Sequence, residues 1–205
     1  VAFGTSLPEL GVSLKAALYD KSGIAIGNII GSNITNILLV LGICSLFSPI
    51  VILFSKIKKD ILIYLGVCVV LIFFMWNEIL ERWEGILLFT GIIFYTIHSF
   101  ITDKSHDEDF EGPVSTWHRT ILLLVFGFVL LYFGSEYFID GAIGFAKIIG
   151  VNDLIIGMSV VALGTSLPEL VTSVFAAVKK EHSISVGNII GSNLFNILSV
   201  LGLVS

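Results

Sequence analysis

Charged residues are scarce in this 205-residue chain: only 13% of its residues are Asp, Glu, Lys or Arg, while 56% are hydrophobic. A soluble domain has roughly 25% charged residues, so the composition excludes a soluble globular protein. It predicts an integral, multi-pass membrane protein that is surrounded by the lipid bilayer and has no nucleic-acid partner. The net charge of −5 says little about partners, because such a chain places its charges in loops.

The apolar runs lack the alternation that barrel strands require. One of them, ILIYLGVCVVLIFFMW, extends from Ile61 to Trp76 without a charge. Lipid permits only α-helices and closed β-barrels, and long unalternating runs are typical of helices. The predicted fold class is therefore all-α, a polytopic transmembrane helical bundle.

The chain has only two cysteines and does not begin with a methionine. Cys44 and Cys68 both lie inside apolar runs, so they indicate neither a disulfide nor a metal pair. There is no initiator methionine: the chain begins at Val1, inside a motif, and ends at Ser205, inside an apolar run. We therefore expect the chain to be part of a longer protein.

Proline is rare too, and two of the four prolines, Pro8 and Pro168, occupy the same place in a repeated motif. The motif GTSLPEL occurs at residues 4–10 and 164–170, and a second motif, GNIIGSN, occurs at 27–33 and 187–193. A shift of about 160 residues aligns 1–45 with 161–205 without a gap, with about 27 of the 45 positions identical. Repeats this far apart indicate the duplication of a whole helical unit.

Charges and helix breakers divide the chain into seven predicted helices, at about 1–18, 24–54, 61–76, 85–101, 119–149, 153–178 and 184–205. The predicted loops between them are 19–23, 55–60, 77–84, 102–118, 150–152 and 179–183. The two GTSLPEL helices are the first and the sixth, and an odd separation makes them run in opposite directions. The sequence therefore predicts an inverted-topology repeat, which places a transport site near the membrane midplane.

Lysine and arginine predict the orientation. One face of the membrane receives Lys56, Lys58, Lys59, Lys104, Arg119, Lys179 and Lys180, and the other receives Lys15, Lys21, Arg82 and Lys147. The first set is larger, so it is predicted to be cytoplasmic.

The repeated motifs combine oxygen donors with a loosened helix. Pro8 cannot donate a hydrogen bond to the carbonyl of Gly4, and Thr5, Ser6 and Glu9 share a helix face. The second copy repeats this arrangement with Pro168, Thr165, Ser166 and Glu169. Backbone, hydroxyl and carboxylate oxygens form a hard ligand set, suited to Na⁺ or Ca²⁺.

The second motif adds neutral oxygen donors four residues apart: Ser32 and Asn36 in one copy, Ser192 and Asn196 in the other. Two bare carboxylates at the midplane would repel each other, and one would take up a proton. A divalent cation between Glu9 and Glu169 would neutralise both.

Structural explanations compete with this interpretation. A proline in a membrane helix often makes only a kink, but an intramembrane Glu is a functional hypothesis by default. We expect packing to explain the small-residue stripe of glycines 23, 27, 31, 187 and 191. Ligand or interhelical hydrogen-bonding roles are both open for Asn28, Asn33, Asn188 and Asn193, and we favour hydrogen bonding.

Other polar features have weaker claims to a function. The acidic loop at 103–111 lacks an EF-hand pattern and is interpreted as a solvated linker. Glu136 and Asp140 could face water, act in gating or lie at the interface. No catalytic residue is predicted, because Pro8 occupies the last glycine of a G-x-S-x-G pattern. We therefore do not expect an enzyme.

GTSLPEL and GNIIGSN-x-x-N, present in both inverted copies, resemble the α-repeats of the calcium/cation antiporter superfamily, in particular sodium/calcium exchangers and their prokaryotic relatives. The resemblance implies ten helices in two inverted halves of five, of which this chain begins in the second and ends in the eighth. It implies a first half at 1–101, a short cytoplasmic loop at 102–118 and a second half at 119–205. It also implies a prokaryotic inner (plasma) membrane protein; the oligomeric state stays open.

The resemblance implies that Glu9 and Glu169 bind Ca²⁺ and help to bind Na⁺, and that the carbonyls of Thr5 and Thr165 complete the Ca²⁺ site. Flanking Na⁺ sites would use Ser6, Ser32, Ser166, Ser192 and the carbonyls of Ala2 and Ala162, with Asn36 and Asn196 in the middle. Potassium-dependent relatives usually have Asp at the place of Asn196, so the resemblance argues against K⁺ dependence. It implies exchange of Na⁺ for Ca²⁺ by alternating access with no cofactor; H⁺/Ca²⁺ exchange is the alternative.

Overall fold

The computed structural model describes residues 1–20, 22–51, 54–77, 79–102, 117–148, 150 and 156–205. Within these ranges the regular structure is helical, with no strand. The main helices are α2 (Leu7–Leu18), α3 (Ser22–Thr35), α5 (Phe54–Phe74), α6 (Arg82–Thr102), α7 (Trp117–Ile148), α10 (Leu167–Val178) and α11 (His182–Phe195). Short helices extend or precede them: α1 (Ala2–Thr5), α4 (Leu41–Phe47), η2 (Met75–Asn77), α9 (Ala162–Thr165) and α12 (Gly202–Val204).

Three segments are π-helical: η1 (Asn36–Val40), η3 (Ile156–Val161) and η4 (Asn196–Leu201). Two of them begin at an asparagine of the repeated motif. In η1, the N–H of Leu41 donates to the carbonyl of Asn36, five residues back. Such wider turns are frequent at functional sites. Here two of them begin at the candidate ligands Asn36 and Asn196.

The prediction of a helix at 24–54 was wrong at its end. The span made by α3, η1 and α4 stops at Phe47, and Ser48 is extended, with φ −151° and ψ 123°. The cause is Pro49, whose ring excludes the helical conformation from the residue before it. The next helix begins at Phe54, so the predicted loop at 55–60 is the start of α5.

The start of α6 was also misplaced. The helix begins at Arg82 and not at 85. The Glu84 carboxylate accepts a hydrogen bond from the N–H of Glu81 at 2.8 Å, which satisfies a free donor at the helix start. Residues that looked like a charged loop therefore form the first turn. Residues 103–116, including the acidic loop, and residues 153–155 lie outside the described part of the chain.

Both GTSLPEL segments are broken helices. The break falls at Ser6 (φ −86°, ψ 9°) between α1 and α2, and at Ser166 (φ −80°, ψ 3°) between α9 and α10. The segments Ser159–Thr165 and Leu167–Val178 differ in direction by 46°. Proline two residues after each break cannot donate to the preceding turn, so the sequence explains why the same bend occurs twice.

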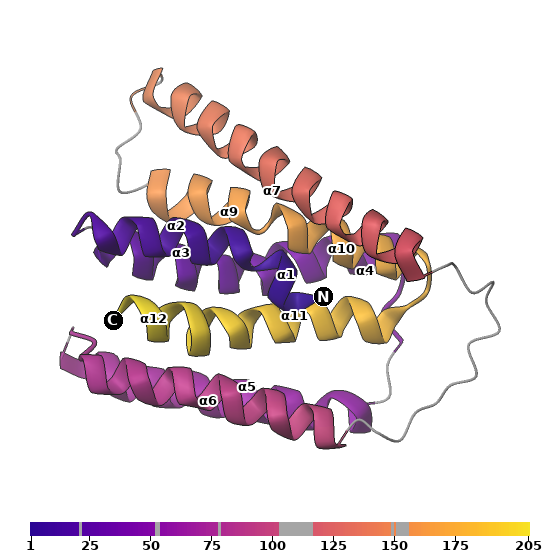
Figure 1. The fold of residues 1–205 in the computed structure, drawn as a ribbon, viewed down its shortest axis with the longest axis horizontal. Helices are drawn as coiled ribbons and strands as arrows, with labels where there is room; N and C mark the ends of the chain where they lie inside the picture. Colours follow the sequence, from indigo (N-terminus) through magenta and orange to yellow (C-terminus); the bar gives the residue numbers. More distant parts are fainter. Residues whose placement is uncertain (21, 52–53, 78, 103–116, 149, 151–155) are drawn as a thin grey trace.

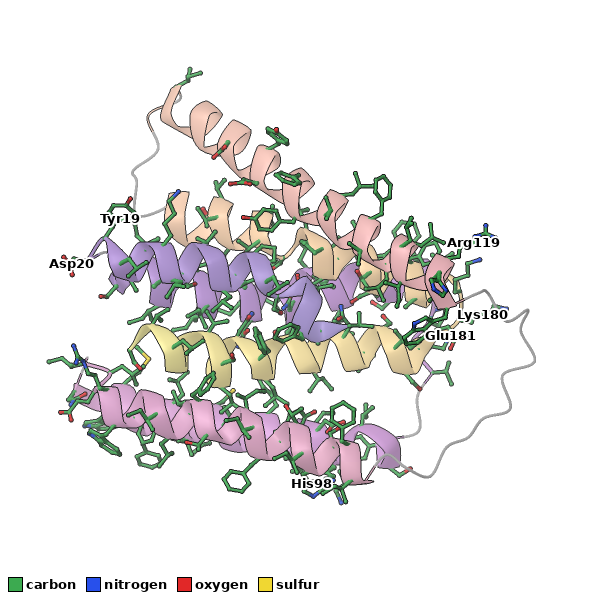
Figure 2. All side chains as sticks on the ribbon, viewed as in Figure 1. Tyr19, Asp20, His98, Arg119, Lys180 and Glu181 are labelled. Atoms are coloured by element: carbon green, nitrogen blue, oxygen red, sulfur yellow. The ribbon has the colours of Figure 1, made fainter. Side chains whose placement is uncertain are left out.

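The two copies run in opposite directions (Figures 1 and 2). Tyr19 and Asp20, which follow α2, lie at one end of the molecule, whereas Lys180 and Glu181, which follow α10, lie at the other. Asp20 and Lys180 occupy equivalent places and both have positive φ, 56° and 65°. The predicted inverted repeat is therefore confirmed. Among the described residues, five helices are long and apolar enough to cross a membrane, and the bent pair makes a sixth.

The helices lie roughly parallel or antiparallel in layers, with α3 and α11 near the middle, α5 and α6 on one side and α7 crossing obliquely on the other (Figure 1). Core residues such as Leu194, Val200 and Leu201 are fully buried, while large apolar side chains along α5, α6 and α7 are exposed, as lipid contact requires. The carbonyl of Gly85 lies 2.9 Å from the place where a Cβ on Gly202 would sit, so α6 and α12 approach backbone to backbone.

Three residues of the larger predicted basic set, Lys59, Arg119 and Lys180, lie at one end of the bundle. His98, Arg119 and Lys180 lie at the same end of the bundle (Figure 2). The Nζ of Lys59 lies 3.1 Å from Nδ1 of His98, which places the start of α5 at that end too.

Candidate functional site

The predicted ligand residues meet at the interface between the two repeats, where the broken helices face α3 and α11 of the opposite copy. Their side chains are sealed from solvent: each is at most 1% exposed. They are Thr5, Ser6, Glu9, Ser32 and Asn36 from the first copy, and Thr165, Ser166, Glu169, Ser192 and Asn196 from the second. Ala162 is 1% exposed and Ala2 is half-buried.

The serine at each helix break bonds to the carboxylate of the other repeat. Ser6 Oγ donates to Glu169 Oε1 at 2.8 Å, and Ser166 Oγ donates to Glu9 Oε1 at 3.5 Å. The second carboxylate oxygen of each glutamate, Oε2, is buried without a hydrogen-bond partner. Among the described residues, no basic side chain forms an ion pair with either glutamate. A buried carboxylate with a free oxygen and no counter-charge is costly, and this pair could hold a cation that offsets the cost.

Two asparagines present further free oxygens. Asn36 Nδ2 donates to Asn193 Oδ1 at 3.0 Å, and Asn196 Nδ2 donates to Asn33 Oδ1 at 3.1 Å. The Oδ1 atoms of Asn36 and Asn196 are left buried without a partner. Together with the two glutamates, they make four unsatisfied buried oxygens at one interface.

A hydroxyl cluster flanks this group on each side. On one side, Thr165 Oγ1 donates to the carbonyl of Ala162 at 3.1 Å, and Ser32 Oγ lies 3.1 Å from Thr165 Oγ1. On the other, Thr5 Oγ1 donates to the carbonyl of Ala2 at 3.1 Å, with Ser192 Oγ at 3.4 Å. Each cluster therefore joins a hydroxyl and a carbonyl from one repeat to a serine of the other.

The donor set fits hard cations. It contains carboxylate, amide, hydroxyl and carbonyl oxygens, which suit Ca²⁺ and Na⁺ and not soft metals. Among the described residues, no group of three or more His, Cys, Asp or Glu side chains could hold a metal. The site charge therefore comes from two carboxylates, which one divalent cation balances.

The remaining asparagines act between helices. Asn28 Oδ1 lies 3.2 Å from Thr165 Oγ1, and Asn188 Oδ1 lies 3.4 Å from Thr5 Oγ1, so each amide oxygen shares the single hydroxyl proton of a threonine with the carbonyl of Ala162 or Ala2. Their amide groups donate to Ser13 and Ser173, each at 3.0 Å. The hydrogen-bonding role favoured for these asparagines agrees with this geometry. Sequence reasoning overlooked the two serines, although their identical places in the repeat were a usable signal.

The other predicted features lie apart from the ligand set. Glu136 and Asp140 of α7 line a groove of about 540 Å³ that is bordered by Pro8 and Lys15 of α2. In the glycine stripe, a Cβ on Gly191 would lie 2.9 Å from that of Ala2, whereas one on Gly23 or Gly187 would meet nothing within 4 Å. Close packing of the ligand helices therefore applies at Gly191 and not along the whole stripe.

The family model described as "sodium/calcium exchanger protein" matches residues 1–101 and 119–205. The chain belongs to this family. It is 38% identical to CaxA of Alkalimonas amylolytica over 98% of the chain and 66% of that protein. It is 34% identical to the sodium/calcium exchanger MaX1 of Methanosarcina acetivorans, over 99% of the chain and 70% of MaX1. The chain thus spans about two thirds of the length of these relatives.

A solved structure agrees with the family assignment. The sodium–calcium exchanger NCX_Mj of Methanococcus jannaschii, soaked with Na⁺ and Sr²⁺, matches all of this chain and 67% of its own, with a TM-score of 0.84 and 36% identity. The exchanger family and this likeness confirm the predicted all-α, multi-pass membrane fold.

Proposed function

We propose that the protein exchanges Na⁺ for Ca²⁺ across a membrane, with the ions bound between the two repeats. The observation that carries the proposal is the group of four buried, unpartnered oxygens on Glu9, Asn36, Glu169 and Asn196. Unsatisfied buried oxygens are rare in folded proteins, and a pseudo-symmetric set of four with two negative charges is most simply explained by a bound cation.

The oxygen clusters support one central and two flanking ion positions. The glutamates and asparagines would bind Ca²⁺ centrally, together with the carbonyls of Thr5 and Thr165. The clusters around Ser32 and Ser192, with the carbonyls of Ala162 and Ala2 and the break serines Ser6 and Ser166, would bind Na⁺. The two ions would share carboxylates, so their binding would be mutually exclusive, as exchange requires.

Charge balance predicts electrogenic exchange. One Ca²⁺ neutralises the two carboxylates, whereas three Na⁺, one in the central and one in each flanking position, would leave one net positive charge. An empty site would hold two buried negative charges, and moving these across a dry barrier is costly. Return of the protein without an ion would therefore be slow, and exchange would predominate over leak.

Alternating access would use α7. This helix crosses the bundle obliquely (Figure 1), and none of the apolar window at Trp117–Gly134 is buried. The groove between α2 and α7 reaches Pro8, one residue from Glu9. Sliding of α7 against α2 would open or close that groove with little loss of packing.

The test uses the full-length protein in sealed vesicles. Vesicles loaded with Na⁺ and diluted into Na⁺-free buffer should take up radioactive Ca²⁺. Because three Na⁺ would leave for each Ca²⁺ that enters, one net positive charge would leave the vesicle in each cycle, so an inside-positive membrane potential should speed the uptake. A buried glutamate outside the site, Glu84, provides a matched control: Glu84→Gln should keep uptake, because a Gln oxygen still accepts from Glu81.

Three outcomes would count against the proposal in different ways. Uptake driven by a pH gradient without Na⁺ would establish H⁺/Ca²⁺ exchange in its place. Equal Ca²⁺ flux with and without a counter-ion would indicate a channel-like protein. No Ca²⁺ uptake under either gradient would show that the substrate assignment is wrong.

A further inference from the structure

We propose that Asn33 and Asn193 are positioning residues that turn the side-chain oxygens of Asn196 and Asn36 toward the bound ion and favour an uncharged side chain at those two positions. We call Asn33 and Asn193 the asparagine clasp. This inference deepens the proposed function, on which it rests. Both clasp residues are buried, at 6% and 1% exposure, and neither has an orphaned side-chain atom.

Backbone carbonyls determine the polarity of the clasp. Asn33 Nδ2 donates to the carbonyl of Asn193 at 3.2 Å, and Asn193 Nδ2 donates to the carbonyl of Asn33 at 3.4 Å. A backbone carbonyl can only accept, so the amide nitrogen of each clasp residue must face the other helix. Each Oδ1 is thereby directed the other way, as an acceptor.

That acceptor orients the neighbouring site asparagine. Asn193 Oδ1 receives Asn36 Nδ2 and Asn33 Oδ1 receives Asn196 Nδ2. If either site amide were flipped, two buried acceptor oxygens would face each other without a proton between them, which costs free energy on both. The clasp therefore leaves Oδ1, and not Nδ2, of Asn36 and Asn196 free for a cation.

The same geometry selects charge. An ionised carboxylate at position 36 or 196 has no proton to donate and would face the clasp oxygen directly. The clasp thus favours a neutral side chain at both places and holds the formal site charge at −2, the charge of Glu9 and Glu169. One divalent cation would balance this charge of −2.

The connections cross between the repeats, which allows a selective test. Asn33→Ala removes the acceptor of Asn196 but leaves that of Asn36, since Asn193 keeps its own bond to the Asn33 backbone. Asn193→Ala does the reverse. If a clasp variant lowers ion affinity by misorienting one site asparagine, it should cause no further loss of affinity in a protein that already lacks that asparagine.

The experiment measures the thermal unfolding midpoint of the purified full-length protein against Ca²⁺ or Na⁺ concentration, because an ion that binds only the folded state raises this midpoint. Asn33→Ala should raise the Ca²⁺ concentration for half-maximal stabilisation about tenfold, the size expected for misorienting one buried hydrogen-bonded ligand. In an Asn196→Ala background, Asn33→Ala should leave this Ca²⁺ concentration unchanged. In an Asn36→Ala background, it should again raise it about tenfold. Asn193→Ala should show the reciprocal pattern.

Equal factors in both backgrounds, or a lower ion-free midpoint with unchanged Ca²⁺ affinity, would overturn the clasp and leave only a packing role. If an alanine variant does not fold, Asn33→Ser enters the same cycle. Its hydroxyl can still accept from Asn196, so its factor should be smaller than tenfold and should again vanish in the Asn196→Ala background. Ion stabilisation without Na⁺-driven uptake in vesicles would refute the exchange function and still test the clasp. No response of the wild type to either ion would refute both.

Discussion

The two repeats contain nearly the same residues in different surroundings. In the span Ser22–Phe47, 33% of the apolar window is buried, against 78% in the equivalent span His182–Val204. The difference arises because α5 and α6 pack against α11, η4 and α12. The ligand side chains are nevertheless at most 1% exposed in both copies. The ligands are therefore equally buried in the two copies, although α5 and α6 pack against the second copy.

The hydrogen bonds show where the copies differ. Ser6 approaches Glu169 to 2.8 Å, whereas Ser166 stays 3.5 Å from Glu9. By contrast, the Asn28–Ser13 and Asn188–Ser173 bonds have the same length, 3.0 Å. The asparagine–serine hydrogen bonds behind the ligands are therefore equal in the two copies, whereas the serine–glutamate hydrogen bonds differ in length.

The largest effect should come from neutralising either carboxylate. Glu9→Gln and Glu169→Gln should each reduce Na⁺-driven Ca²⁺ uptake by at least about 100-fold, since removing one charge from a buried set costs about 3–5 kcal/mol. Uptake in sealed vesicles measures this. Retention of half the wild-type rate by one variant only would break the equivalence of the repeats.

Next in size is the serine at each break. Ser6→Ala should weaken ion binding about tenfold and Ser166→Ala about threefold, because a short bond to a carboxylate contributes more than a long one. Ion-dependent unfolding midpoints give both values. Identical losses would mean that the two serines make equivalent contacts in the protein in solution.

A smaller effect is expected where the copies touch through small residues. Gly191→Ala should destabilise the protein by about 1–3 kcal/mol, because the new methyl group would overlap Ala2 and force α11 away from α1. Gly187→Ala, one turn earlier with nothing within 4 Å, is the matched control and should be neutral or stabilising by up to about 1 kcal/mol. Thermal unfolding compares them. Equal destabilisation would contradict a close approach at Gly191 that Gly187 lacks.

The smallest effect should come from the symmetric support. Ser13→Ala and Ser173→Ala each remove one neutral hydrogen bond to an asparagine, so ion affinity should fall by about threefold in both. The same ion titrations apply, and the informative quantity is the ratio of the two losses. A ratio far from one would show that the asymmetry of the carboxylate contacts extends to the residues behind them.

Much of the architecture could be predicted because it depends on local rules. Long apolar runs require helices in lipid, and an odd number of helices between two copies requires inversion. The errors fell where local signals conflict. Lys56, Lys58 and Lys59 looked like a loop, yet they begin α5, because Pro49 had already ended the previous helix at Phe47.

Sequence reasoning favoured hydrogen bonding for Asn33 and an ion-binding role for Asn36, but it could not name the partner of either residue. Asn33 and Asn36 lie three residues apart on one span, and both are buried. Only the packing of α3 against α11 makes Asn33 a partner of Asn196 and leaves the Asn36 oxygen free. No local rule distinguishes a ligand from its support when both have the same side chain.

Hydropathy, proline geometry and repetition along the chain are enough to predict the helices, the two broken turns, the inverted order and the oxygen-donor residue types. Packing between the repeats establishes which donors meet and which amide oxygens stay free. Those properties depend on distances between residues about 160 positions apart, and such distances exist only once the two copies have packed against each other.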